Sequence, residues 1–328
     1  MFPHLLCSLV LQASATVDEP LSFTIEPARS PAFSAMLRVA DDAQDDGFEM
    51  RMVARAAIEG FDGWSFDSTL GGKLFQRADL DEGDVSLARI GVRFEALHPL
   101  GRWRDLGLEL RVEQSGYDFS DSSTIDGVDE VWLFSLGSSL TTRMRDDWSW
   151  TLHLNASAGA EDSADWSQSL TVGGGASATL PMTKDWSLTA GGFASSRLED
   201  DPLFYPWVQL DWQPNDQVRL GDSGDGYGLD VSWVEGISTY VNLSFVERQY
   251  RMDGYEVDEV DFSDGAFRDS EFAVNAGAVF QWNSRLKLEF FGGAAIRELT
   301  LLDDGESEVF QDTTRPTTYF GLALRYGF

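Results

Sequence analysis

The sequence predicts an all-β fold, a transmembrane up-and-down antiparallel β-barrel of about 16 strands, or 14 if one doubtful hairpin is not formed. Three observations predict it. Apolar and polar residues alternate over segment after segment from residue 48 onward. Tryptophans recur near the ends of these segments. The connections alternate between short turns and longer acidic stretches.

The composition excludes two broad classes of protein. The 328 residues include 55 Asp and Glu against 24 Lys and Arg, which gives a formal net charge of −31. Hydrophobic residues make up 43%, which is too many for a chain that stays disordered. A surface that binds nucleic acid needs basic residues to neutralise phosphates, so the acidic balance argues against a nucleic-acid partner.

The N-terminus has the features of a secretory signal peptide. An apolar run, Leu5 to Leu11, precedes the small residues Ala13 and Ala15, which fit a cleavage pattern. No Lys or Arg precedes the run, so a frayed hydrophobic N-terminus is the alternative. The only cysteine, Cys7, lies in this run, and cleavage would therefore leave no thiol for a disulfide or a metal site.

The alternation indicates strands with one apolar and one polar face. Leu106, Leu108 and Leu110, for example, alternate with Gly107 and Glu109. The same period runs through residues 48–58, 88–96, 148–158, 272–282 and 286–296. These segments are longer than the usual 5–6 residues of a strand in a soluble sandwich and reach the roughly 9–11 residues that cross a bilayer. A large soluble β-barrel or sandwich is the alternative fold.

Tryptophans mark the ends of the predicted strands. Amphipathic rings favour the headgroup level of a membrane, and aromatic girdles bound the apolar band of membrane barrels. Ordinary core tryptophans are the alternative. The residues near turns are Trp103, Trp148, Trp150, Trp166, Trp186, Trp212 and Trp282.

The connections predict two unlike rims. Eight acidic segments hold 33 of the 55 acidic residues: 41–46, 79–84, 118–130, 161–165, 199–202, 222–225, 252–270 and 303–312. Short turns lie between them in sequence. Long polar loops on one rim and short turns on the other are typical of outer-membrane barrels, and eight loops imply about 16 strands. The weakest elements are the first strand, residues 33–40, and the hairpin around 222–226.

The last residues carry a family resemblance. Every second position to the end of the chain is apolar or aromatic: Phe320, Leu322, Leu324, Tyr326 and Phe328. This strand resembles the last strand of Gram-negative outer-membrane β-barrel proteins, a porin-like superfamily, and the strand repeat extends the resemblance over most of residues 33–328. The resemblance implies an outer-membrane location and implies that these five residues are the signal read by the barrel assembly machinery. It identifies a superfamily and no particular activity.

The expected organisation follows. Residues 1–15 are the signal peptide, 16–32 an N-terminal periplasmic segment and 33–328 the outer-membrane barrel. Expected partners are outer-membrane lipid and lipopolysaccharide, the assembly machinery, and divalent cations held loosely by the acidic loops. The stretches 222–226 and 253–264 lack the spacing of a calcium loop, so neither a metal site nor a cofactor is predicted.

Charged residues on the polar face of the strands are the candidates for the lumen. Lys or Arg facing lipid costs about 2–4 kcal/mol at the membrane centre, so this face is expected to point inward. The candidates are Arg51, Arg55, Arg89, Arg93, Glu95, Glu109, Arg111, Glu113, Arg143, His153, Asp211, Arg219, Arg248, Lys287, Glu289, Arg297 and Arg325.

Two functions fit these candidates. A barrel of 16 strands leaves an aqueous channel, and a charged lumen selects small polar solutes, which favours porin-like passive passage. The alternative is a non-transporting barrel, surface-structural, adhesive or enzymatic, whose interior ion pairs fill and rigidify it. No phosphate-binding loop or zinc motif is present and the spacing of the three His residues secures no catalytic arrangement, so no enzyme activity is predicted.

Overall fold

The computed structural model describes residues 63–327 except 82, 121–124, 127, 145–147, 162, 223–225, 258–259 and 304–307. It also describes the backbone of four earlier strands. The chain divides into two units, Met1–Trp64 and Ser65–Phe328, each of which is taken by itself.

The first unit contains a four-stranded antiparallel sheet. Its strands are β1 (Leu6–Thr16), β2 (Ser22–Pro27), β3 (Met36–Val39) and β4 (Gly47–Ala57), in the order β2-β1-β4-β3. The alternating residues of β4 form a strand, as predicted, but pair with β1 and β3. A period of two specifies the faces of a strand and leaves its partner open. Arg51 and Arg55 lie on β4, outside the residues whose side chains the structure describes. Cleavage of residues 1–15 stays a prediction.

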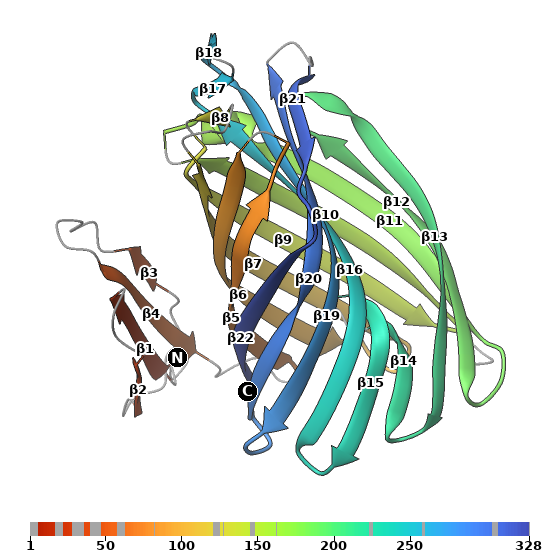
Figure 1. Ribbon diagram of the computed structural model, residues 1–328. Helices are drawn as coiled ribbons and strands as arrows, with labels where there is room; N and C mark the ends of the chain where they lie inside the picture. Colours follow the sequence, from red (N-terminus) through yellow and green to blue (C-terminus); the bar gives the residue numbers. More distant parts are fainter. Residues whose placement is uncertain are drawn as a thin grey trace, which may run out of the picture. The chain divides into compact units, whose positions relative to one another are not determined.

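The second unit is a closed barrel of fourteen antiparallel strands (Figure 1). Each strand pairs with the next around the ring, and the pairing of the last strand with the first closes it. The strands are β5 (Ser65–Asp79), β6 (Asp84–Pro99), β7 (Arg104–Phe119), β9 (Glu130–Arg143), β10 (Ser149–Glu161), β11 (Leu170–Pro181), β12 (Trp186–Arg197), β13 (Asp200–Asn215), β14 (Val218–Asp222), β15 (Tyr227–Val234), β16 (Ile237–Met252), β19 (Gly265–Gln281), β20 (Leu286–Asp303) and β22 (Thr317–Gly327).

Fourteen is the lower of the two predicted strand numbers, and it is reached in an unexpected way. The doubtful hairpin, β14–β15, is formed. The strands that do not join the barrel are instead β3 and β4.

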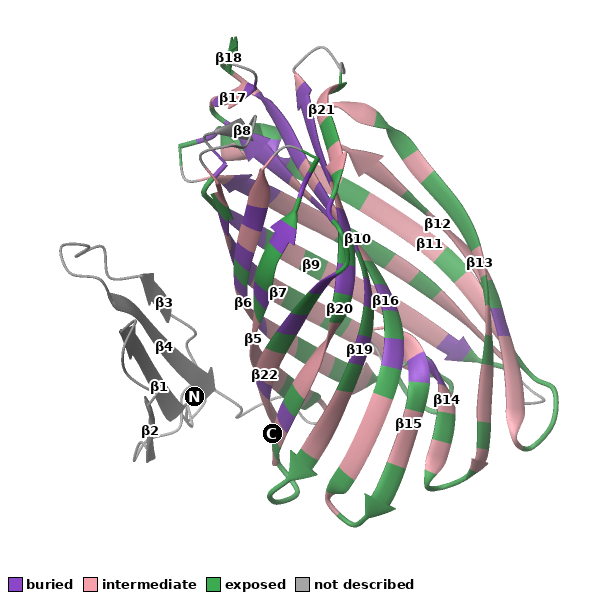
Figure 2. Cartoon of the chain, in the orientation of Figure 1, coloured by how far each residue is buried: buried purple, intermediate pink, exposed green. Residues whose placement is uncertain are grey.

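The outward phase of the barrel strands is apolar and exposed. Leu154, Val208 and Phe320 are 66%, 72% and 60% exposed although each lies within a strand. Exposed and less exposed segments alternate along the strands in Figure 2. So much apolar surface around a closed barrel needs a lipid environment. The predicted fold, an all-β up-and-down barrel with an apolar exterior, is therefore confirmed.

The two ends of the barrel differ. Short turns join the strands at one end, the turn rim, where β5 begins and β22 ends. Trp186 and Trp212 lie at this rim and stack, with ring centroids 5.6 Å apart. Apart from the short β14–β15 hairpin, the connections of the barrel that contain acidic stretches join the opposite ends of the strands, the acidic rim. Additional elements there are β8 (Ile125–Asp126), η2 (Trp166–Gln168), β17 (Tyr255–Val257), β18 (Val260–Phe262) and β21 (Glu308–Thr313).

A contact between two distant strands divides the interior near the acidic rim. Ala160 of β10 pairs in parallel with Arg251 of β16, although five strands separate β10 from β16 around the ring. Gly159 permits the approach, because a Cβ there would lie 2.3 Å from the Gln249 carbonyl oxygen. The eight strands β5, β6, β7, β9, β16, β19, β20 and β22 therefore enclose one part of the interior, and β10 to β13 border the other.

Candidate functional site

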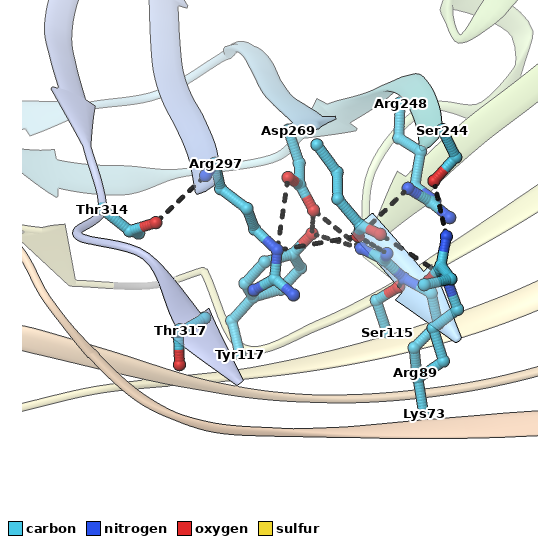
Figure 3. Close-up of polar contacts among 12 residues, drawn as sticks. Lys73, Arg89, Ser115, Tyr117, Ser244, Arg248, Asp269, Arg297, Thr314 and Thr317 are labelled. Atoms are coloured by element: carbon cyan, nitrogen blue, oxygen red, sulfur yellow. Dashed lines mark hydrogen bonds and ion pairs between the residues drawn. The ribbon is translucent and has the colours of Figure 1, made fainter. Parts of the chain in front are cut away.

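A cluster of charged side chains fills one part of the barrel interior. Its members project from β5, β6, β7, β16, β19 and β20, and we call them the interior cluster (Figure 3). Alternation places each of them on the polar face of its strand, which explains how strands far apart in sequence bring them together. The members are Lys73, Arg89, Glu113, Arg248, Asp269, Glu271 and Arg297.

Arg89 joins the opposing strands β7 and β19. Its Nη2 lies 2.7 Å from Asp269 Oδ2, and its Nη1 lies 2.8 Å from Glu271 Oε2. Its Nε donates a hydrogen bond to Ser115 Oγ at 2.9 Å. Tyr117 Oη donates to the same Asp269 oxygen at 2.6 Å. One guanidinium thus uses its fork of donors to connect two carboxylates and a hydroxyl across the interior.

Glu113 binds two further guanidinium groups, those of Arg248 and Arg111. It accepts a hydrogen bond from Arg248 and pairs with Arg111, which is one-third exposed at the margin of the cluster. Arg248 Nη1 also lies 3.8 Å from Glu271 Oε2. The strands β7, β16 and β19 are therefore linked by one continuous ionic network.

Glu271 and the ring of Phe75 contact the other two cationic side chains of the cluster, Lys73 and Arg297. Glu271 lies 3.5 Å from Lys73 Nζ and 3.7 Å from Arg297 Nε. The Arg297 guanidinium stacks over Phe75, 3.6 Å from the ring centroid, which is a cation–π contact. Thr314 Oγ1 accepts a hydrogen bond from the Arg297 backbone N–H at 3.0 Å (Figure 3).

The interior cluster is removed from solvent. Its three arginine and three carboxylate side chains are at most 5% exposed, and Lys73 is half-buried. Three buried positive charges therefore face three buried negative charges, as the high cost of an unpaired buried charge requires. The side chains of the cluster therefore fill this part of the barrel and form a plug.

A layer of apolar side chains separates the cluster from the acidic rim. Along β6 the inward residues change from Arg93 through Arg89 to Leu87 and Val85 as the strand is followed toward this rim. We call the part of the barrel closed by the cluster and this layer the plugged side. The layer includes Phe75, Val85, Leu87, Val131, Leu133, Tyr250, Met252, Phe267, Leu299 and Leu301.

The strands β10 to β13 enclose a different interior, which we call the small-residue side. Gly175, Ser177 and Gly191 face inward on neighbouring strands, and the Phe193 ring of β12 packs against Gly175. Asn155 faces inward and is nevertheless exposed, and Tyr205 of β13 is 44% exposed. Polar and accessible inward positions of this kind indicate a wet interior.

Ion pairs connect the small-residue side to the plugged side near the acidic rim. Arg197, at the end of β12, binds Glu247 of β16 with distances of 2.7 Å from Nη2 and 3.1 Å from Nε. Glu199, two residues after Arg197, has a backbone φ of +47°, a conformation that strains a residue other than glycine. We call the three pairs here the outer clasp: Arg197–Glu247, Glu199–Arg251 and Asp200–Arg268.

Other predicted lumen residues lie nearer the turn rim, and most of them are more exposed, although Glu289 is buried. Arg93 Nη2 lies 2.8 Å from Glu109 Oε2 and 3.0 Å from Glu95 Oε1. Arg325 Nη2 lies 3.2 Å from Glu289 Oε2. The remaining candidates do not join one group: Arg143 pairs with Asp105, Arg219 with Asp211, Lys287 is exposed, and His153 is half-buried on β10.

The sequence pattern missed three members of the interior cluster, Lys73, Asp269 and Glu271. The prediction that residues 252–270 form an acidic loop is wrong at its end, because β19 begins at Gly265 and Asp269 is fully buried. Residues 269 and 271 lie on the same inward face of β19 as Asn275, at every second position. Extending the alternation of residues 272–282 backwards along the strand would have identified them as inward-facing.

The C-terminal strand β22 lies between β20 and β5 and closes the ring. Phe320 is on its outward face, and Phe328 lies outside the described residues. Within the described part of the chain, no group of three or more His, Cys, Asp or Glu is arranged to hold a metal ion. No helix among the described residues is long and apolar enough to cross a membrane.

Solved structures with a similar architecture include outer-membrane channels. An outer membrane channel from Pseudomonas putida F1 is 11% identical, with a TM-score of 0.43, over 81% of this chain and 95% of that one. The toluene transporter TodX from P. putida is 8% identical, with a TM-score of 0.38, over 81% and 90%. The KdgM porin in complex with disordered oligogalacturonate is 9% identical, with a TM-score of 0.31, over 79% and 99%. No protein-family model and no curated protein matches the chain.

The strand pairing and the side-chain orientation of the barrel show which class of protein the chain belongs to. The strand order is closed, all neighbours in the ring are antiparallel, and large apolar side chains cover the outside while charged ones face inward. Long acidic connections and short turns occupy opposite rims. These are the features that a barrel needs to span a bilayer without an unpaired edge at its seam. The chain is a fourteen-stranded β-barrel of the outer-membrane class.

Proposed function

We propose that the protein is a channel of the bacterial outer membrane through which small polar solutes diffuse along the small-residue side. The contrast between inward residues supports this route. The inward residues of the interior cluster and the apolar layer are buried, whereas on β10 to β12 Asn155 is exposed and Ser177 and Gly191 are partly exposed. Solutes can cross only where the interior is not filled by side chains.

The predicted lumen residues then have two roles. Arg93, Glu95, Glu109 and Asp211 meet solutes at the turn rim, where charges of both signs select for polar molecules without a strong preference for one sign. Arg89, Glu113, Arg248 and Arg297 hold the plug. Beyond the small-residue side, solutes pass the outer clasp at the acidic rim.

Single-channel conductance in planar bilayers tests the route. The variant Asn155→Trp places a bulky side chain inside the small-residue side, and we expect it to lower the conductance step by roughly half. Leu154→Trp is the matched control, because Leu154 is the next residue on the same strand and faces outward. Equal steps for both variants and the wild type would contradict the route.

A non-transporting barrel is the second candidate, and the interior cluster favours it because buried ion pairs and an apolar layer stiffen the wall. This candidate predicts no conductance steps from the wild-type protein. It also predicts none from a variant that opens the outer clasp.

A further inference from the structure

The turn that joins β12 to β13 packs onto three strands that are not its neighbours in the ring, β16, β19 and β20. We call residues 196–201 the β12–β13 turn. Leu198 at its tip is buried in one apolar cluster with Ala266 of β19 and Leu302 of β20. The Leu198 backbone N–H donates a hydrogen bond to Gln249 Oε1 of β16 at 2.7 Å. The turn is therefore docked by an apolar contact and a hydrogen bond in addition to the ion pairs of the outer clasp.

The surface that receives the turn belongs to the outward face of these strands. On β19 this face runs from Phe272, which is exposed, to Ala266, which is buried. On β20 it runs from the exposed Ile296 to the buried Leu302. Both changes occur toward the acidic rim, where the turn packs. The outward face therefore passes from a lipid-facing surface to a covered one at the point of docking.

The docked turn lies over the acidic-rim end of the small-residue side. β10, the first strand of this side, meets β16 where Ala160 pairs with Arg251. The β12–β13 turn meets β16 again at Glu247 and Gln249. Between them, Gln168 of η2 accepts a hydrogen bond from Arg251 Nη2 at 3.1 Å. The wall from β10 through β11 to β12 thus returns to β16 at both of its ends, and the turn completes this circuit.

The contacts of the turn are of a kind that can be released without breaking the barrel. The pairing of β12 with β13 is regular as far as Ser195 and shifts before Arg197, so the turn is set apart from the ladder. Glu199 has a strained backbone in the docked position. The carboxylates that hold the turn, Glu247 and Asp200, are partly exposed, and ion pairs of this kind stabilise a structure less than fully buried ones do.

We propose that the β12–β13 turn is a lid over the acidic-rim mouth of the small-residue side. Docked on β16, β19 and β20, it closes the mouth, and its release opens the route to small polar solutes. The proposal rests on the proposed function, since the lid controls the same route. The ladder from Trp186 to Ser195 stays intact when the lid moves, because the docking contacts all lie beyond it.

Cross-linking of the docked lid tests its effect on passage. In a Cys7→Ser background, Leu198→Cys and Ala266→Cys are joined by a bis-methanethiosulfonate with an ethylene spacer. We expect the cross-link to lower the single-channel conductance step at least tenfold and a reducing agent to restore it. Ser86→Cys with Asp118→Cys is the matched control, because these side chains lie 3.1 Å apart at the acidic rim of the plugged side. A cross-link there should leave the step unchanged.

Spin-label distances report the position of the lid independently of conductance. In the same background, labels at Asp201→Cys, an exposed position of the turn, and at Asp118→Cys of β7 are compared by double electron–electron resonance. Leu198→Asp places a charge in the apolar contact, which is unfavourable without a partner. We expect it to add a second distance population of at least one-third of the molecules. Ser167→Asp adds the same charge at an exposed position of η2 and should leave the distances unchanged.

Three results would overturn the proposal. They are a cross-linked lid that conducts like the free one, no cross-link between positions 198 and 266 in the folded barrel, and an unchanged distance distribution in Leu198→Asp. If no form of the protein conducts and Leu198→Asp still shows the second population, the proposed diffusion route fails and the movement of the turn stands.

Discussion

The plugged side and the small-residue side are built from the same kind of alternating strand, yet their interiors differ. On the plugged side Arg89 and Glu271 form buried ion pairs beneath an apolar layer. On the small-residue side Asn155 and Ser177 occupy the equivalent inward phase and stay accessible. Alternation therefore determines which face is inward, and the size and charge of the inward residues determine whether the interior is filled.

The largest effect is expected from breaking the interior cluster. Asp269→Ala removes the carboxylate that pairs with Arg89 at 2.7 Å and accepts the Tyr117 hydroxyl at 2.6 Å. An uncompensated buried charge remains, and we expect a loss of about 3–5 kcal/mol in the free energy of unfolding. Urea unfolding of the barrel in detergent micelles measures it.

The control for this variant is an exposed pair. Asp79 and Arg315 lie 3.3 Å apart with both side chains mostly exposed. Asp79→Ala should change the unfolding free energy little, because exposed ion pairs contribute little to stability. Similar losses in both variants would mean that the cluster is not a stabilising plug.

A smaller effect is expected at the outer clasp, where the two sides meet. Glu247→Gln weakens the contacts from both Arg197 nitrogens, which lie 2.7 Å and 3.1 Å from the carboxylate. Charge-assisted hydrogen bonds of this kind are each worth about 1.5–3 kcal/mol. We expect the end of β12 to move more freely and the single-channel conductance to rise. Unchanged conductance would show that the clasp does not limit passage.

The sequence predicts the barrel, its two rims and its last strand well, because these features depend on local patterns. The alternation around Leu108 and the terminal run through Phe320 both form strands with outward apolar faces. The partner of a strand depends on contacts made after folding, so the pairing of β4 with β1 does not follow from its period. For the same reason the pattern alone does not show that Lys73 meets Glu271 from a strand 198 residues away.

Cysteine accessibility in the folded barrel tests the contrast between the two sides most directly. In the Cys7→Ser background, Ser177→Cys lies on the small-residue side, and Ser115→Cys lies fully buried beside Arg89. A methanethiosulfonate that carries a trimethylammonium group should modify Ser177→Cys and lower its single-channel conductance, while Ser115→Cys should stay unmodified. Rapid modification and block at position 115, with none at 177, would contradict the assignment of the plug and of the solute path.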